Sequence, residues 1–112
     1  MFPYSPAFAE RSLEALSPDG LCDYRNPFET ETAHLLGKLE REGRSFAGIR
    51  PFAAGRVFTE SWPDAAKPAD PGHAVRESLR FALDHPAICT TIVTATATDH
   101  VDALLAAAEA LS

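Results

Sequence analysis

Three threonines alternate with two alanines in the run TATAT, which follows an apolar stretch and directly precedes an amphipathic one. A hydroxyl group can donate a hydrogen bond to a phosphate oxygen, and the start of a helix offers unpaired N–H groups and a partial positive charge. Thr94, Thr96 and Thr98 therefore indicate an anion-binding site between a strand and a helix. The alternative is a threonine-rich strand end with an ordinary Thr98 helix cap. Asp99 and Asp102 favour this alternative because they repel a phosphate.

The other residues that could do chemistry form no catalytic or metal-binding pattern. The four histidines lack metal-ligand spacing, and the sequence contains no glycine-rich phosphate loop and no nucleophile elbow. We expect no metal site, and we expect His34 and His85 at the surface. Cys22 and Cys89 lie outside any CxxC pattern, which predicts free thiols buried in the strands of a cytoplasmic protein. Trp62 is either a lid over neighbouring helices or an anchor for a partner.

The composition excludes several classes of protein. The chain has 112 residues, 46% of them hydrophobic and 23% charged, which predicts one globular domain over 1–112 with a modest core. The formal net charge is −6 and there is no basic stripe, so we expect no nucleic-acid partner. No apolar run approaches the roughly 20 residues that span a bilayer, and the first residues show no signal peptide, so we expect no membrane partner.

Helical and strand patterns alternate along the chain. Apolar residues at helical spacing predict helices at about 5–16, 30–42, 70–83 and 98–111. Runs that lack polar alternation or are rich in Ile, Val and Thr predict strands at 21–24, 45–50 and 87–94. The order α-β-α-β-α-β-α indicates an α/β fold with a parallel sheet. Residues 51–72 contain four prolines and are expected to form a long loop.

Particular residues are expected at the helix ends and on the buried helix faces. Ser5 and Asp70 are expected to cap the first and third helices, and Gly43 suits the left-handed position that ends the second. The third helix is expected to bury Val75, Leu79, Ala82 and Leu83. The last helix is expected to form an apolar face from Val101, Leu104, Leu105, Ala108 and Leu111.

Three stretches together resemble the carboxyl-terminal part of the aldo/keto reductase family. They are RNPFETE after the first strand, IRPFAAGRVF after the second, and LRFALDHPAICTTIVTATATDHVDALLAAAEA at the end. The residues that match the motifs of this family are Asn26, Pro27, Pro51, Phe52, Gly55, Asp99, His100 and Val101. Arg50 stands in place of the family's serine, and Thr94 stands in place of its glycine. The resemblance covers residues 5–111.

The resemblance implies a fold and a cofactor. Aldo/keto reductases are (β/α)8 barrels that reduce carbonyl groups with NADPH, and a whole barrel needs about 200–250 residues. The chain therefore resembles the last three βα units, a partial TIM-barrel-like sheet. The cofactor-binding residues implied are Arg50, Phe52, Gly55, Thr94, Thr96, Thr98 and His100, with Arg50 or Arg56 supplying positive charge. The catalytic residues of the family lie in its first four units, so no catalytic residue is expected here.

Three functions remain open on this evidence. The first is an NADP(H)-dependent oxidoreductase by resemblance, catalytically incomplete alone. The second is a non-enzymatic partial-barrel scaffold that oligomerises or binds a partner protein. The third is a new activity at the strand ends, with the candidate groups Asn26, Glu29, Arg50, Arg56 and Thr96. Because a three-stranded sheet has two open edges, we expect a homo-oligomer or a complex with a complementing barrel fragment.

Overall fold

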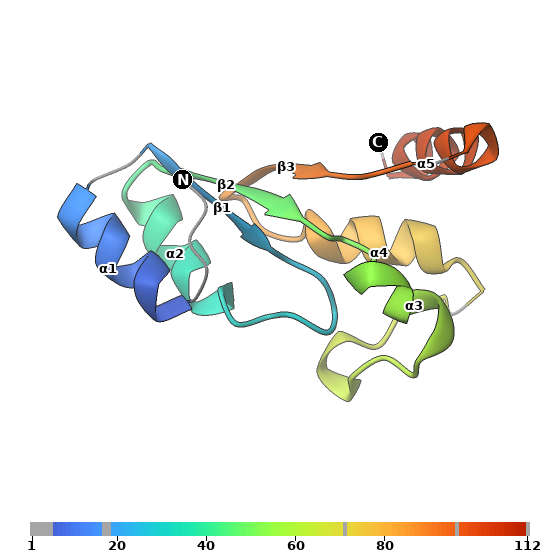
Figure 1. The fold of residues 1–112 in the computed structure, drawn as a ribbon, viewed down its shortest axis with the longest axis horizontal. Coiled ribbons are helices and arrows are strands. Elements are labelled where there is room, and N and C mark those ends of the chain that lie inside the picture. The colour runs from blue at the N-terminus through green and yellow to red at the C-terminus, as the bar shows by residue number, and fades with distance from the viewer. Residues whose placement is uncertain (1–5, 17–18, 71, 96, 112) are drawn as a thin grey trace.

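A three-stranded parallel sheet forms the centre of the molecule (Figure 1). The computed structural model describes residues 6–16, 19–70, 72–95 and 97–111. The strands follow one another in chain order across the sheet, so β1 and β3 are its edges in the described chain. Their bounds are Gly20–Tyr24 for β1, Ser45–Ile49 for β2 and Ile88–Ile92 for β3. The predicted α/β fold with parallel strands is confirmed, and it is consistent with part of a barrel.

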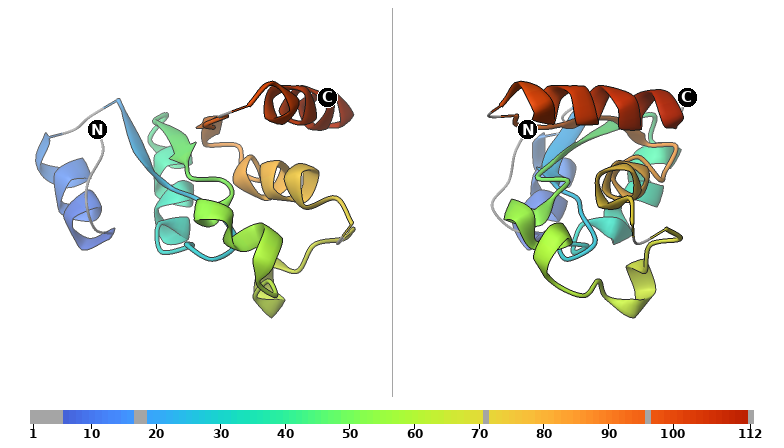
Figure 2. Two further views of the ribbon diagram at one scale, coloured as in Figure 1. Left: turned by 45° about the vertical axis from the view of Figure 1, so that its right-hand side comes forward. Right: turned by 90° about the vertical axis from the view of Figure 1, so that its right-hand side faces the viewer.

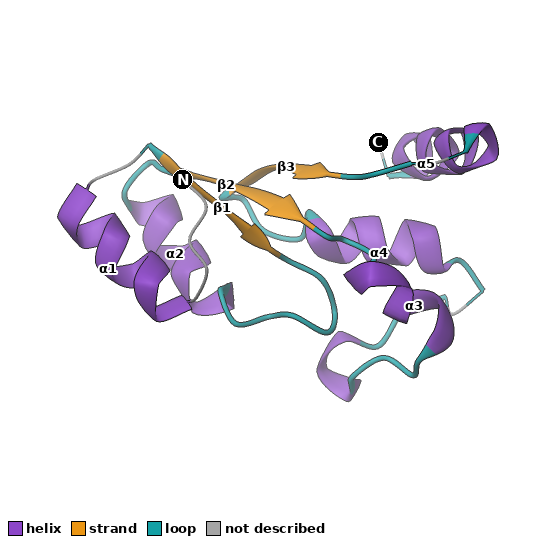
Figure 3. Cartoon of the chain, in the orientation of Figure 1, coloured by secondary structure: helices purple, strands orange, loops and turns teal. Residues whose placement is uncertain are grey.

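Helices alternate with the strands, as Figure 3 shows. Their bounds are Pro6–Leu16 for α1, Ala33–Arg41 for α2, Arg56–Thr59 for α3, Ala74–Ala82 for α4 and Thr98–Ala110 for α5. Two 3-10 turns, η1 at Ala53–Gly55 and η2 at Asp64–Ala66, lie in the connection between β2 and α4. The prediction of a long loop over residues 51–72 was therefore wrong in part. This segment folds locally because Val57 of α3 is buried.

One face of the sheet carries the core. Leu21 of β1, Phe46 of β2 and Ile88 of β3 are paired across the strands and are all buried. They join a cluster that includes Ala9 and Leu13 of α1 and Leu35, Leu36 and Leu39 of α2. The strands approach so closely here that a Cβ atom at Gly20 would lie 2.7 Å from the carbonyl oxygen of Ser45. The sheet and the first two helices thus form the packed half of the molecule.

The opposite face of the sheet is more open. Successive side chains of a strand point to opposite faces, so the second face carries Cys22, Tyr24, Ala47, Ile49, Thr90 and Ile92. Thr90 is exposed, and 55% of the surface of Ile92 is accessible to solvent. A closed barrel would turn this face inward and fill it with side chains from other strands.

Two helices begin later than the sequence indicated. Asp70 does not cap α4, because its side chain accepts a hydrogen bond from the N–H of Gly72 (3.2 Å) and its carbonyl accepts one from His73 (3.0 Å). These bonds form a turn, and α4 starts only at Ala74. The second helix starts at Ala33, after a turn in which the N–H of Ala33 donates to the carbonyl of Thr30 (3.0 Å). Gly43 takes the expected left-handed conformation, with φ of 67°.

Three further expectations concern helix ends and buried positions. Thr98 is the first residue of α5 rather than its cap, because the preceding Ala97 is extended and makes no side-chain cap bond. Leu83 lies beyond the end of α4 and is 42% exposed, whereas Glu77 and Ser78 are buried. The predicted cap Ser5 lies outside the described residues.

The last helix packs mainly against α4 and not against the sheet. Figure 2 shows α5 beyond the end of β3 and alongside α4. The expected apolar face is not buried: Val101 is 43% exposed and Leu105 58%. Ala107 is the buried residue of α5 instead. The helix therefore buries a small side chain and leaves larger apolar residues in solvent. Among the described residues, no helix has the length and hydropathy needed to span a membrane.

Candidate functional site

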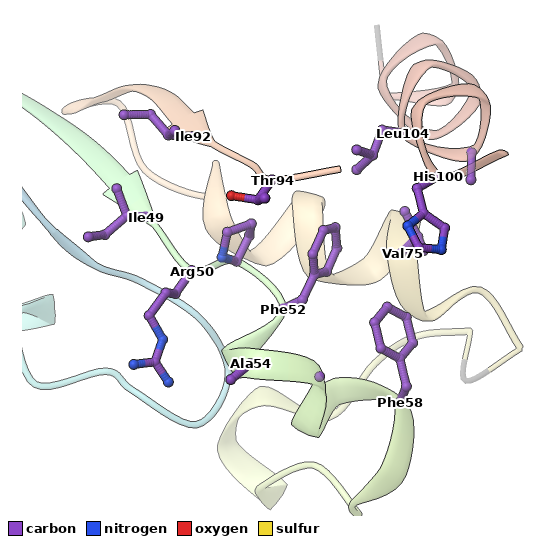
Figure 4. Close-up of a pocket in the computed structure, with 13 residues that line it drawn as sticks. Ile49, Arg50, Phe52, Ala54, Phe58, Val75, Ile92, Thr94, His100 and Leu104 are labelled. Carbon is purple, nitrogen blue, oxygen red and sulfur yellow. The ribbon is translucent and has the colours of Figure 1, made fainter. Parts of the chain in front are cut away.

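A cavity of about 750 Å³ opens at the carboxyl ends of β2 and β3. Its walls come from the end of β2, η1, α3, the end of β3, and the amino-terminal halves of α4 and α5 (Figure 4). Ligand sites in parallel α/β folds form at this end of the strands, and small-molecule sites commonly measure about 300–1,000 Å³. The place and the size of the cavity are therefore those of a small-molecule site.

The cavity brings together most of the residues that the sequence indicated. Arg50, Phe52, Gly55, Thr94 and His100 all line it. These residues are up to 50 positions apart in the chain and come from three separate stretches: the segment after β2, the segment after β3, and α5. Thr98 is exposed and does not line the cavity. Thr96 lies outside the described residues.

A left-handed stretch of backbone shapes the wall after β2. Arg50, Ala53 and Ala54 have φ between 52° and 55°, and Gly55 has φ of 91°. A left-handed residue other than glycine costs roughly 1–2 kcal/mol. Backbone hydrogen bonds from Ala53 to Arg50 (3.1 Å) and from Gly55 to Phe52 (2.9 Å) hold the turn. This turn carries Phe52 and Ala54 into the lining of the cavity.

Asn26 fixes the base of the same wall. Its side-chain amide is completely buried and donates to the carbonyl of Arg50 (2.8 Å) and to the carboxylate of Glu29 (3.0 Å). Its side-chain oxygen accepts from the N–H groups of Phe28 and Glu29, both at 2.9 Å. Asn26 of the Asn-Pro motif therefore has a structural role. The sequence analysis instead considered Asn26 as a candidate for a new activity.

Both arginines near the cavity are paired with carboxylates. The Arg50 guanidinium lies 3.4 Å from Glu29 and 4.7 Å from the centre of the Tyr24 ring. Figure 4 shows it directed away from Phe52 and the cavity. Arg56 does not line the cavity, and its guanidinium bonds Glu60 at 2.9 and 3.3 Å. These hydrogen bonds raise the pKa of Arg56 above its usual range. A phosphate in the cavity would have to compete with Glu29 for Arg50.

Two polar side chains line the cavity from different parts of the chain. Thr94 follows β3, and the ring of His100 projects from α5 toward Val75 and Phe58 (Figure 4). Within the described part of the chain, neither the Thr94 hydroxyl nor the His100 ring has a hydrogen-bond partner. Both groups can donate or accept, so both are open to a ligand. Phe58, Val75 and Leu104 also line the cavity, although sequence reasoning did not select them.

Other candidate residues have structural surroundings. The indole N–H of Trp62 donates to the carbonyl of Val57 (3.0 Å), so Trp62 fastens the α3 segment. His34 is exposed as expected, but His85 is half-buried and accepts a hydrogen bond from the N–H of Ala87 (3.1 Å). Cys22 is half-buried and Cys89 is exposed, so the expectation of a buried Cys89 was wrong. No group of three or more potential metal ligands occurs among the described residues.

Comparison of the chain with models of protein families, with curated proteins and with solved structures finds no match.

Proposed function

We propose that the chain is the cofactor-side segment of an aldo/keto reductase-like barrel and is catalytically incomplete alone. The observation that carries the proposal is the cavity at the carboxyl ends of β2 and β3. It gathers Arg50, Phe52, Gly55, Thr94 and His100, five of the residues that the resemblance connects with NADP(H). Such a segment would act in an NADP(H)-dependent oxidoreductase, and free thiols at Cys22 and Cys89 support a cytoplasmic setting.

The lining suits the ring and ribose parts of a nicotinamide nucleotide better than its phosphate groups. Phe52 and Leu104 offer apolar surface to a ring, and the Thr94 hydroxyl can donate to a ribose or phosphate oxygen. Arg50 would bind a phosphate only after leaving Glu29, which lies 3.4 Å from its guanidinium. When bound, NADPH supplies the hydride for carbonyl reduction, while these residues would hold and orient it.

The ion pair between Arg50 and Glu29 provides a direct test. Glu29→Gln removes the competing charge, while glutamine can still accept the hydrogen bond from Asn26. We expect NADPH to bind this variant at least about tenfold more tightly, the effect of roughly one additional hydrogen bond to a charged group. Glu60→Gln is the matched control, since it frees Arg56 outside the cavity and should leave the affinity unchanged. Calorimetric titration measures both. Absence of NADPH binding in all three proteins would refute the proposal.

The isolated chain should also fail to oxidise NADPH with aldehydes. Carbonyl reduction needs a proton donor as the hydride arrives, and the sequence contains no match to the family's catalytic residues. We expect no aldehyde-dependent loss of NADPH absorbance over a panel of aldehydes. Turnover that falls in Phe52→Ala but not in a surface variant would contradict the catalytically incomplete assignment.

A non-enzymatic scaffold is the second candidate, and the open sheet favours it. Both edge strands are unpaired on one side in the described chain, and the face that carries Thr90 and Ile92 is exposed. Unpaired strand edges are surfaces for association with another chain. Such a scaffold would assemble without NADPH, so assembly that persists in variants unable to bind NADPH would favour it.

A further inference from the structure

Arg25 is a buried cation at the end of β1. Only 7% of its surface is exposed, and its completely buried Nε atom has no hydrogen-bond partner among the described residues. Its guanidinium lies 4.4 Å from the centre of the Phe81 ring of α4. Burial lowers the pKa of Arg25, but an arginine side chain keeps its proton in a folded protein. A positive charge is therefore held between the sheet and α4.

Within the described chain, no acidic side chain neutralises this charge at ion-pair distance. The charge of Asp84 acts on Arg25 from further away, and Asp84 is exposed. Asp23 lies on the same face of the sheet, but Arg25 is not among the charges that act on its carboxyl group. Glu77 is buried on α4 and lies 3.8 Å from Arg80. The face of an aromatic ring attracts a cation but offsets only part of the cost of burying its charge.

Gly48 of β2 leaves space beside Arg25. A Cβ atom at this position would lie 3.4 Å from Cβ of Arg25, 3.5 Å from Oγ1 of Thr91 and 3.8 Å from Cε1 of Phe46. These are ordinary van der Waals distances, so the core face of the sheet has room here for at least one further atom. The Oγ1 atom of Thr91 is completely buried, and it has no hydrogen-bond partner in the part of the chain that the structure describes.

A second buried hydroxyl group comes from α4. Ser78 is completely buried, and its Oγ atom also has no partner among the described residues. It stands three positions before Phe81, and residues at this spacing share one face of a helix. The Ser78 hydroxyl therefore belongs to the face of α4 that meets Arg25. Buried polar groups are nearly always hydrogen-bonded, so three donors around one positive charge indicate a missing negative acceptor.

We propose that a small monovalent anion, of the size of chloride or formate, binds between Arg25, Thr91 and Ser78 on the core face of the sheet. The anion accepts hydrogen bonds from these donors and neutralises the guanidinium, whereas a water molecule would supply only the hydrogen bonds. The neighbours of Gly48 within 3.8 Å favour a small ion over phosphate. None of these residues lines the cavity, so the site is independent of the function proposed above.

Nuclear magnetic resonance of the chloride ion tests this site directly. The protein should broaden the chloride resonance, because bound chloride relaxes quickly and exchanges with the free ion. Formate should remove this excess broadening by competition, and phosphate at equal ionic strength should not. A parent protein without excess broadening would mean that water alone occupies the site, which would overturn the proposal. Displacement by phosphate as strong as that by formate would contradict the size of the ion.

Four variants locate the anion. Arg25→Met keeps an apolar chain against Phe81 without the charge and should abolish the excess broadening. Gly48→Ala fills the space with a methyl group and should weaken chloride binding at least about tenfold, as should Thr91→Val, which removes one hydrogen bond to a charged group. Gly37→Ala adds the same methyl group in α2 and should leave binding unchanged. Equal broadening in all these proteins would place the anion elsewhere and refute the site.

Thermal unfolding and NADPH complete the test. A ligand that binds only the native state raises the melting temperature, so replacement of gluconate by chloride should stabilise the parent protein more than Arg25→Met. The comparison of the two proteins removes general effects of salt, and equal shifts would contradict a role for Arg25. NADPH should leave the chloride resonance unchanged, since the cavity is a separate site. Loss of the broadening on addition of NADPH would show that the two sites are one and overturn the proposal.

Discussion

The side-chain amide of Asn26 donates a 2.8 Å hydrogen bond to the backbone carbonyl of Arg50 and thereby joins the ends of two neighbouring strands. The same amide bonds Glu29 and accepts two backbone N–H groups, so all its hydrogen-bonding positions are occupied. Because Asn26 is completely buried, water cannot replace these bonds. The backbone of Arg50, one of the residues that line the cavity, is thus fixed by a side chain 24 positions earlier.

Removal of this amide should destabilise the whole fold. Asn26→Ala removes the four hydrogen bonds that this buried side chain makes, and a typical intramolecular hydrogen bond contributes about 0.5–1.5 kcal/mol net. We expect a loss of about 3 kcal/mol in the free energy of unfolding, measured by urea denaturation. Thr30→Ala, at an exposed position of the same loop, is the control. A loss no larger than in this control would mean that the corner is held by other contacts.

Asp23 should make stability depend on pH. Burial raises the pKa of this carboxyl group, and repulsion from Glu31 and Glu29 acts in the same direction, against the hydrogen bond from the N–H of Tyr24. The native state holds the proton more tightly than the unfolded chain. The contribution of Asp23 to the free energy of unfolding therefore falls as pH rises from about 3.8, the ordinary value, through the raised native pKa.

Asp23→Asn tests this linkage, because asparagine keeps an acceptor for the Tyr24 N–H without the charge. The variant should be more stable than the parent protein at pH 7, and the difference should disappear near pH 3. Urea denaturation at both pH values measures it, with the exposed Asp19→Asn as control. A variant less stable than the parent at pH 7 would show that the charge is compensated in the fold.

The two thiols should differ in reactivity. Cys89 is exposed. It is the extra residue of a β-bulge in β3, because Phe46 pairs with Ile88 whereas the next residue, Ala47, pairs with Thr90. Burial raises the pKa of the half-buried Cys22 thiol, which leaves less thiolate at pH 8.

Reaction with a disulfide reagent at pH 8 should therefore show two phases, with rates that differ about tenfold. Cys89→Ser should remove the fast phase and Cys22→Ser the slow one. A single phase in the parent protein would mean that the two surroundings are equivalent.

Self-association should depend on the open face of the sheet. Ile92 lies on this face at the edge strand β3 and is 55% exposed. Burial of apolar surface is worth about 25 cal/mol per Å², so a second copy that covers this face would gain stability. We expect a dimer by light scattering, and a monomer in Ile92→Lys. Leu16→Lys, on the exposed end of α1, should leave the dimer intact. A parent protein that stays monomeric at high concentration would exclude association through this face.

The strand order and the main core could be predicted because local sequence patterns determine them. Leu21, Phe46 and Ile88 stand in short apolar runs between turn residues, and such runs have one stable place in an α/β fold, under the helices. The face of α5 could not be predicted in the same way. Periodicity places Val101 and Leu105 on one side of a helix, but it does not tell which side meets α4.

The site was predictable where motifs follow strands directly, as with Phe52 after β2 and Thr94 after β3. Phe58 was missed because α3 lies in a proline-rich segment that reads as a loop; only its neighbour Val57 is buried, while 55% of the Phe58 surface is exposed. The pairing of Arg50 with Glu29 was also missed. It depends on how two strand ends are placed side by side, which no local pattern encodes.

The attachment of α5 to α4 has a consequence for motion. A helix held mainly by one neighbour opens at a lower free energy than elements of the central sheet, so its amide hydrogens should exchange earlier than those of β2. His100 and Leu104 would leave with it, since both belong to this helix. Detachment of α5 would then remove one wall of the cavity, and an occupant in contact with His100 and Leu104 would lose those contacts.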